Sequence, residues 1–289
     1  MIRKLRIILE MIKFEHTVFA LPFAFLGAIL GSVAMNGHLP SWSEIGWVTL
    51  AMFGARSAAM SLNRVIDAAI DKKNPRTSNR AIPAGLLKSV EVVAFVIVSF
   101  ALLFIAAYNL EPIAMKLMPI AVFFLVIYSY TKRFTWLCHI VLGLTIALSP
   151  LGGWVAVTGE FSASAWLLYG TVALWIAGFD IIYATQDFEY DRGEGIHSIP
   201  ARFGIAGALW IARGLHVVTA IGFILLFVST QLSWLYLFGA LLSVTLLFYQ
   251  HYMVRPHDLS RVQTAFFGMN GTLSFVLFAF AFIDLVVFG

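Results

Sequence analysis

Long apolar stretches separated by short polar segments run through the whole chain. Nine of them approach the ~20 residues that a helix needs to cross ~30 Å of hydrocarbon. They cover residues 17–35, 44–66, 90–109, 113–130, 136–157, 163–186, 207–228, 231–250 and 264–288. The sequence lacks the alternating ten-residue segments of a membrane β-barrel. The pattern predicts an all-α, polytopic membrane protein, a bundle of nine transmembrane helices forming a single domain over residues 1–289.

The composition supports an integral membrane protein. Hydrophobic residues make up 61% of the 289 residues and charged residues 12%, about half the roughly 25% charge of a soluble domain. So few polar side chains cannot cover a water-facing surface, which excludes a soluble enzyme or a disordered chain. The cations do not form a nucleic-acid footprint, so we expect no nucleic-acid partner. A single cysteine, Cys138, excludes an intramolecular disulfide and a cysteine-based zinc site.

The basic residues indicate an orientation. All but two of the 19 Lys and Arg residues fall in segments on the same side of the membrane as the N-terminus. The exceptions are Lys116, on the opposite side, and Arg56, inside the second apolar stretch. Because positive residues concentrate on the cytoplasmic side, we expect a cytoplasmic N-terminus. The two longest connections, near 67–89 and 187–206, then also face the cytoplasm, and length beyond a turn is often functional.

Carboxylates are concentrated where these two connections begin. Asn63, Asp67 and Asp71 are spaced four apart after the second stretch, and Asp187 and Asp191 share this spacing after the sixth. Residues four apart lie on one helix face, so each set predicts a ladder of oxygens. Asp180 lies on the same face as Asp187, deeper in the membrane.

Such ladders are unfavourable without a counter-charge. Carboxylates at a helix C-terminus meet the negative end of its dipole and repel one another one turn apart. A divalent cation would neutralise them, and an all-oxygen donor set suits Mg²⁺, which completes its shell with water and substrate phosphates. Nearby cations suit phosphate oxygens; they are Lys72, Lys73, Arg76, Arg80, Lys132, Arg133 and Arg192. The competing interpretation of either ladder alone is a solvated helix end.

A weak internal repeat favours the functional interpretation. Asp67-x3-Asp71-Lys72 is followed by Ile82-Pro83-Ala84, and Asp187-x3-Asp191-Arg192 by Ile199-Pro200-Ala201. The copies end stretches two and six, four helices apart. The repeat therefore predicts two related halves that face each other around a shared site.

On these motifs the chain resembles the UbiA superfamily of intramembrane polyprenyltransferases over essentially its whole length. Two further segments are similar to that family, Asn79-Arg80-Ala81-Ile82-Pro83-Ala84-Gly85 and Tyr128-Ser129-Tyr130-Thr131-Lys132-Arg133. The resemblance implies Mg²⁺-dependent transfer of a polyprenyl group from its diphosphate to a small aromatic acceptor in quinone biosynthesis. It also implies a multi-pass protein of a bacterial inner or archaeal cell membrane.

The resemblance assigns roles by position. It implies that Asp67, Asp71, Asp187 and Asp191 hold the metal and diphosphate as the catalytic set. Substrate-binding roles are expected for Asn63, Arg80, Tyr130, Lys132, Arg133 and Asp180. Arg64 departs from the Asp that many members carry after the Asn of the first motif. The segments around Gly178-Phe179-Asp180 and His197-Ser198-Ile199 are more similar to the menaquinone-route subgroup, which acts on a dihydroxynaphthoate, than to ubiquinone-type 4-hydroxybenzoate enzymes.

Other classes of protein remain in view. The main rival is a secondary transporter that uses intramembrane acids, although transporter sites usually lie at the membrane midplane. A phospholipid-headgroup transferase lacks support because its compact Asp-, Gly-, Ala- and Arg-containing motif is missing. A scaffold subunit is the third alternative.

Several single residues carry structural expectations. Asp180 either supports the site or forms a structural pair, and Arg56 is expected to be structural. Asp284 is expected to be solvated. The histidines are expected to be packing or interfacial residues, and His197, in the second long connection, is the best candidate for an exception. An aromatic belt at the outer interface is expected from Trp42, Trp47, Trp154, Trp166 and Trp234. Gly143, Gly152 and Gly153 are expected to allow close helix packing.

Overall fold

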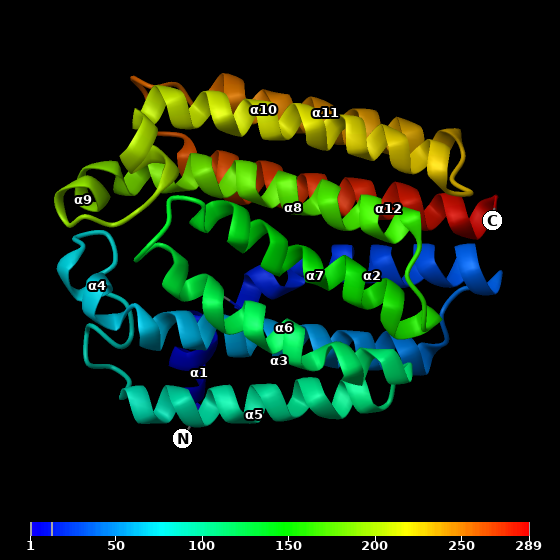
Figure 1. The fold of residues 1–289 in the computed structure, drawn as a ribbon, viewed down its shortest axis with the longest axis horizontal. Coiled ribbons are helices and arrows are strands. Elements are labelled where there is room, and N and C mark those ends of the chain that lie inside the picture. Colours follow the sequence, from blue (N-terminus) through cyan, green and yellow to red (C-terminus); the bar gives the residue numbers. More distant parts are fainter. Residues whose placement is uncertain (1, 13, 289) are drawn as a thin grey trace.

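The structure is a computed structural model that describes residues 2–12 and 14–288, and the side chains of residues 2, 3, 5 and 14–20 lie outside that description. Helices and helical turns make up the ordered elements (Figure 1). In chain order they are α1 (Ile2–Met11), α2 (Phe14–Asn36), α3 (Trp42–Ile66), α4 (Ala68–Lys73), α5 (Ser89–Tyr108), α6 (Pro112–Thr131), α7 (Cys138–Thr158), α8 (Ala163–Ala184), the 3₁₀ turn η1 (Thr185–Asp187), α9 (Phe188–Gly193), α10 (Ile199–Ser229), α11 (Trp234–Met253), the π-helical turn η2 (Thr264–Met269) and α12 (Asn270–Val287).

The prediction of an all-α, multi-pass membrane protein is confirmed. Eight helical stretches in the described part of the chain are long and apolar enough to cross a membrane. Among the residues whose side chains the structure describes, α2 adds a further apolar helical stretch, Leu21–Asn36. Eight of the nine predicted stretches each correspond to one long helix, within a few residues for all but α10, and the ninth covers η2 and α12 together. The count of nine spans, the orientation and the relation between two halves stay predictions.

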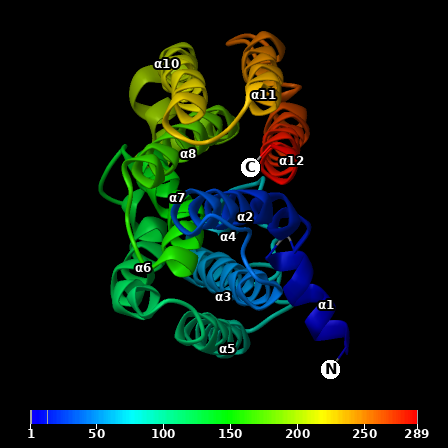
Figure 2. The ribbon, with the colours of Figure 1, turned by 90° about the vertical axis from the view of Figure 1, so that its right-hand side faces the viewer.

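The long helices form two groups that are in contact (Figure 2). The first is a ring in which each helix packs against the next, in the order α2, α7, α8, α10, α11, α12 and back to α2. In the second, α3 packs against α5 and α6, and this group meets the ring where α3 contacts α2 and α6 contacts α7. The short elements α4 and α9 lie together at one end of the bundle, and the C-terminus lies at the opposite end (Figure 1). The two acidic segments therefore meet at one end of the molecule.

Close contact between α2 and α7 depends on glycine. A Cβ on Gly153 would lie 2.3 Å from the carbonyl oxygen of Ala24, and one on Gly143 would lie 2.2 Å from that of Ala173 in α8. A Cβ on Gly152 would meet no atom within 4 Å. The packing role is thus confirmed for Gly143 and Gly153, whereas the prediction for Gly152 is wrong.

Two buried side chains differ from expectation. Trp154 is 1% exposed and packs in the core formed by α2, α7 and α8, so its assignment to the aromatic belt is wrong. Asp284 is also 1% exposed rather than solvated. Its carboxylate accepts hydrogen bonds from the backbone N–H groups of Ser233 and Tyr236, at 2.9 and 2.7 Å. It therefore satisfies donors left open at the start of α11, which explains how a carboxylate can be buried there.

The predicted span 207–228 begins earlier in the structure. α10 starts at Ile199 and breaks at Gly204, whose φ of 73° is a conformation that glycine adopts without strain. The two copies of the Ile-Pro-Ala repeat therefore differ in secondary structure. Ile199-Pro200-Ala201 begins a helix, whereas Ile82-Pro83-Ala84 lies in turns.

Candidate functional site

Both acidic segments begin at an interruption of a long helix. α3 ends at Ile66 and α4 starts at Ala68, with Asp67 between them at φ −91° and ψ 0°. Asp187 closes the 3₁₀ turn after α8 and precedes α9, at φ −99° and ψ 6°. This bridge region of backbone space is sparsely populated and recurs in active sites. The first aspartate of each predicted ladder therefore lies at a break between two helical elements.

Asp67 is the most enclosed carboxylate of the first segment, at 1% exposure. Its Oδ2 accepts hydrogen bonds from Asn63 Nδ2 at 2.8 Å and from Lys132 Nζ at 2.7 Å. Arg133 Nη2 lies 3.1 Å from Oδ1 and also donates to the carbonyl oxygen of Ile66 at 2.8 Å. The end of α6 thus supplies two cations to an aspartate at the end of α3.

Asp71 has a cation of its own. It is 3% exposed, and Arg80 Nη1 donates to its two carboxylate oxygens at 2.7 and 2.8 Å. Thr77 Oγ1 donates to the Asp71 carbonyl oxygen at 3.1 Å, which folds the connection back over α4. The connection after α4 therefore brings one of its cations, Arg80, back to an acid of the same segment.

Arg76 joins the first segment to the second. Its guanidinium forms an ion pair with Asp187, with Nε 2.8 Å from Oδ1, and Asn74 Nδ2 donates to the same oxygen at 2.9 Å. Burial opposes the charge on Arg76, but the hydrogen bonds and negative charge of Asp187 outweigh it and raise the pKa of the guanidinium above its ordinary value. Tyr190 donates to the Ile70 carbonyl oxygen at 2.9 Å, a second link between the segments.

The acidic segments close one end of a cavity of about 1250 Å³. Eight of the ten predicted site residues line it: Asn63, Asp67, Asp71, Arg80, Lys132, Asp180, Asp187 and Asp191. Tyr130 and Arg133 are not among the lining residues. Tyr130 is 40% exposed, with the Arg133 guanidinium 5.4 Å from its ring centre. The structure therefore gives no support to a substrate-binding role for Tyr130, and it places Arg133 behind Asp67.

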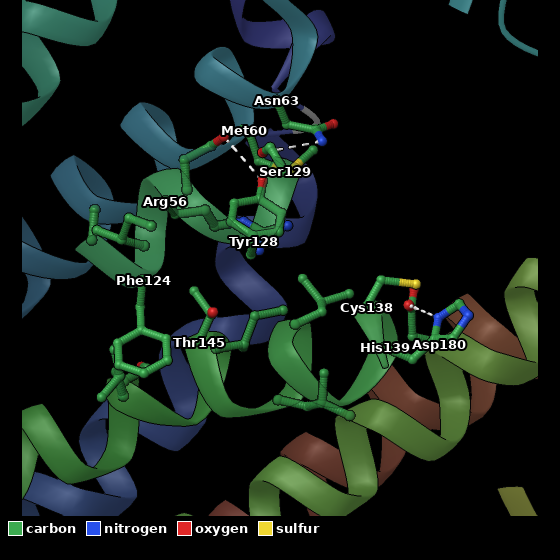
Figure 3. A pocket seen from close by; sticks show the side chains of 18 of the residues that line it. Arg56, Met60, Asn63, Phe124, Tyr128, Ser129, Cys138, His139, Thr145 and Asp180 are labelled. Atoms are coloured by element: carbon green, nitrogen blue, oxygen red, sulfur yellow. Dashed lines mark hydrogen bonds and ion pairs between the residues drawn. The ribbon is translucent and has the colours of Figure 1, made fainter. Parts of the chain in front are cut away.

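Farther from the acidic segments the cavity becomes mainly apolar. Side chains from α2, α3, α6, α7 and α8 line this part, among them Phe23, Met52, Leu117, Phe124, Leu142, Ile146, Phe179 and Leu148. Arg56 from α3 also lines the cavity, and its buried Nε has no hydrogen-bond partner in the described part of the chain. Figure 3 shows Arg56 on the same side of the cavity as Tyr128 and Asn63. Arg56 forms no ion pair with another described residue, so the structure gives no support to the expectation that it is purely structural.

A histidine–aspartate pair in the cavity wall was missed by sequence reasoning. His139 Nδ1 donates to Asp180 Oδ2 at 2.7 Å, and both residues line the cavity (Figure 3). They come from α7 and α8 and are 41 residues apart, so no local spacing marks the pair. The one available signal was Asp180 itself, because an acid inside a membrane helix usually has a partner.

The acidic side chains have the donor chemistry for a hard divalent cation. Carboxylate and amide oxygens from Asp67, Asp71, Asp187, Asp191 and Asn63 line the same end of one cavity, and such donors suit Mg²⁺. Within the described ranges no three His, Cys, Asp or Glu side chains are already grouped as a metal site. Instead, three of these carboxylates form ion pairs with cations of the chain: Asp67 with Lys132, Asp71 with Arg80, and Asp187 with Arg76. The donor set fits Mg²⁺, with the cations acting as counter-charges in this arrangement.

Comparison with known proteins identifies the class. The model of the UbiA prenyltransferase family matches residues 20–279, and the chain belongs to this family of membrane prenyltransferases. The 4-hydroxybenzoate octaprenyltransferase of Vibrio campbellii is 30% identical over 238 residues, which cover 82% of this chain and 83% of that protein.

Solved structures agree with this assignment. A UbiA homologue from Aeropyrum pernix K1, described as an apo structure, is 30% identical, with a TM-score of 0.85, covering 94% of this chain and 98% of its own. A UbiA homologue from Archaeoglobus fulgidus bound to GPP and Mg²⁺ is 17% identical, with a TM-score of 0.72, covering 97% of this chain and 100% of its own. The latter likeness is one of fold.

Proposed function

We propose that this prenyltransferase transfers a polyprenyl group from its diphosphate to an aromatic acid, as a step in quinone biosynthesis. The whole chain, residues 1–289, forms one catalytic domain. The observation that carries the proposal is the continuity of one cavity, which is closed by acids and cations at one end and lined by apolar side chains farther in. This division matches a substrate with an anionic head and a hydrocarbon tail.

In the proposed site the diphosphate lies between the two acidic segments. Asp67, Asp71, Asp187 and Asp191 would hold Mg²⁺, which when bound neutralises charge on the departing diphosphate. The Archaeoglobus fulgidus homologue bound to GPP and Mg²⁺ supports this choice of ion. The cations that now pair with the carboxylates, Lys132, Arg80 and Arg76, would turn their N–H groups to phosphate oxygens.

The remaining residues position and protect the reacting groups. Asn63 fixes Asp67 through the 2.8 Å hydrogen bond, and Arg133 supports it from behind. The apolar wall excludes water, which would otherwise capture the allylic carbocation formed when the C–O bond of the diphosphate breaks. An electron-rich ring then attacks the cation, and the ring loses a proton.

Arg56 favours an acceptor that carries a negative charge. A guanidinium inside an apolar cavity, with its Nε unpartnered in the described part of the chain, is costly unless a ligand pairs with it. We assign the carboxylate of the aromatic acid to Arg56. The names of the curated relatives favour 4-hydroxybenzoate, and a dihydroxynaphthoate is the second candidate, on the sequence features described above.

The proposed orientation puts the acidic end of the cavity at the cytoplasmic face, as the segregation of Lys and Arg predicts. The membrane would be a bacterial inner membrane or an archaeal cell membrane. The alternative of a secondary transporter is less well supported, because the acids lie at helix ends instead of at the middle of broken membrane helices.

A direct assay tests the proposal. Membranes containing the protein are incubated with Mg²⁺, a labelled allylic polyprenyl diphosphate, and either 4-hydroxybenzoate or a dihydroxynaphthoate. We expect a prenylated product that requires Mg²⁺, and the preferred acceptor distinguishes ubiquinone-type from menaquinone-type chemistry. If purified protein binds the diphosphate with Mg²⁺ but prenylates neither acceptor, the assignment of the acceptor is wrong. Failure to bind the diphosphate would favour the transporter.

A further inference from the structure

One carboxylate in the cavity is not needed to hold the diphosphate. Asp180 precedes Asp187 by seven residues, which places it about 10 Å deeper along α8 at 1.5 Å per residue. It lines the cavity and retains 22% of its side-chain exposure. An acid at this depth is expensive to keep in a membrane protein and usually has a function or a partner.

The two oxygens of Asp180 differ. Oδ2 accepts the 2.7 Å hydrogen bond from His139 Nδ1, whereas Oδ1 has no hydrogen bond within the described part of the chain. Among the described residues, His139 Nε2 also has no hydrogen-bond partner, but it is enclosed by protein, whereas Asp180 Oδ1 is not enclosed. The open atom of the pair is therefore a carboxylate oxygen in the cavity wall, and the free nitrogen of the imidazole is enclosed.

We propose that Asp180 is the catalytic base that removes the proton from the acceptor ring, and that His139 is the residue that positions it. This inference rests on the proposed function with a 4-hydroxybenzoate-type acceptor. It gives a specific role to a carboxylate that the diphosphate site leaves unused.

The chemistry is balanced without a further reactant. The C–O bond between the prenyl group and diphosphate breaks, and a C–C bond forms between the prenyl carbon and the ring carbon beside the hydroxyl. That ring carbon then loses its hydrogen: the C–H electron pair returns to the ring, and the proton goes to Asp180 Oδ1. The ring cation that gives up this proton is a strong acid, so an ordinary carboxylate is a sufficient base.

The location fits this sequence of events. The leaving diphosphate lies at the acidic end beside Asp187, and its first prenyl carbon lies on the apolar side of it. A ring that attacks this carbon therefore sits at the depth of Asp180, with Arg56 on α3 available for its carboxylate. Figure 3 shows the His139–Asp180 pair across the cavity from Tyr128 and Ser129.

A kinetic isotope effect distinguishes a base from a residue that only binds substrate. Single-turnover rates are measured with 4-hydroxybenzoate that carries hydrogen or deuterium at both ring carbons beside the hydroxyl. In the unmodified protein we expect an isotope effect near unity, since breaking the allylic C–O bond is slower than loss of the proton. In Asp180→Asn, which keeps the shape but not the basicity, we expect turnover to fall by roughly 10²-fold and the isotope effect to rise well above unity.

Matched variants separate the roles. Asp67→Asn should slow the reaction while its isotope effect stays near unity, because it weakens diphosphate departure. His139→Leu should raise the isotope effect, and His139→Asn, which keeps a nitrogen donor to Asp180, should restore a value near unity. Asp258→Asn, in an exposed loop, should change neither quantity. Binding of an unreactive thiolodiphosphate analogue with Mg²⁺ checks that each variant is folded.

Three results would overturn the assignment. An Asp180→Asn variant with the original rate would mean that the diphosphate or solvent takes the proton. A slow variant whose isotope effect stays near unity would place Asp180 in binding or ionisation. If the protein prenylates only the dihydroxynaphthoate and the prenyl group takes the place of its carboxylate, no ring C–H bond breaks and no base is needed for a ring proton. If the unmodified protein prenylates neither acceptor, it is the proposed function that fails.

Discussion

Arg76 and Asp187 form an ion pair between the two acidic segments, although they are 111 residues apart in the sequence. The pair is partly buried, with 29% and 16% of the two side chains exposed. It brings the connection after α4 against the start of α9 at the acidic end of the cavity. A second pair between the segments, Lys73 with Glu194 at 2.9 Å, is much more exposed.

This difference predicts unequal effects of mutation. Arg76→Gln leaves Asp187 without its main counter-charge, and losing a partner of a partly buried charge costs about 1–3 kcal/mol. We expect a lower Tm in detergent and weaker binding of the prenyl diphosphate. Lys73→Gln is the matched control and should lower both far less, because exposed ion pairs contribute little. Equal effects of the two substitutions would contradict the structural role assigned to the Arg76–Asp187 pair.

Arg56 is predicted to affect the acceptor and not the diphosphate. Arg56→Met removes one charge-assisted contact, worth about 1.5–3 kcal/mol, which corresponds to a roughly 10- to 100-fold rise in KM for the aromatic acid. The KM for the prenyl diphosphate should stay the same. A phenol that lacks the carboxylate provides the internal control, since its use should not depend on Arg56. A parallel rise in both KM values would refute the assignment.

Neighbouring glycines in α7 should respond in opposite ways to alanine. Gly153→Ala places a Cβ 2.3 Å from the Ala24 carbonyl oxygen, and such overpacking typically costs about 1–3 kcal/mol. At Gly152 a Cβ meets no atom within 4 Å, so Gly152→Ala should be neutral or slightly stabilising. Thermal unfolding of the two variants in one detergent checks the prediction. Similar Tm values would show that α2 can move away from α7 at little cost.

Asp284 should matter for stability and not for catalysis. Asp284→Ala leaves the backbone N–H groups of Ser233 and Tyr236 without their acceptor. Because unsatisfied buried donors cost about 1–3 kcal/mol, we expect a lower Tm. Activity per folded molecule, measured well below that Tm, should match the unmodified protein. Asp284→Asn keeps one acceptor oxygen and should lie between the two, whereas reduced activity without loss of stability would disprove a capping role.

The helices and the acidic motifs could be predicted because their signals are local. Hydropathy locates each long helix, and the four-residue spacing places Asp67 near Asp71 and Asp187 near Asp191. The partners of buried charges could not be predicted in this way. His139 meets Asp180, and Asp284 meets the start of α11, only after distant helices pack together. Trp154 was misplaced for the same reason, since its position near a helix end did not reveal that α2 and α8 cover it.

The buried His216 and His251 show the same limit. Their ring nitrogens lie 2.7 Å apart between α10 and α11, yet 35 residues separate them in the sequence. The expectation that the histidines are packing residues agrees with the burial of this pair, 0% and 7% exposed. The contact itself depends on tertiary structure, which spacing along the chain does not encode.

The central claim is that both acidic segments bind one prenyl diphosphate together with Mg²⁺, and equilibrium binding tests it most directly. Purified protein is titrated with a farnesyl thiolodiphosphate analogue, with and without Mg²⁺. We predict that binding requires Mg²⁺ and weakens by roughly tenfold or more in Asp67→Asn and equally in Asp187→Asn, since each loses a charged contact worth about 1.5–3 kcal/mol. Asp258→Asn should bind normally. Unchanged affinity in either acidic variant, or binding that ignores Mg²⁺, would contradict the shared site.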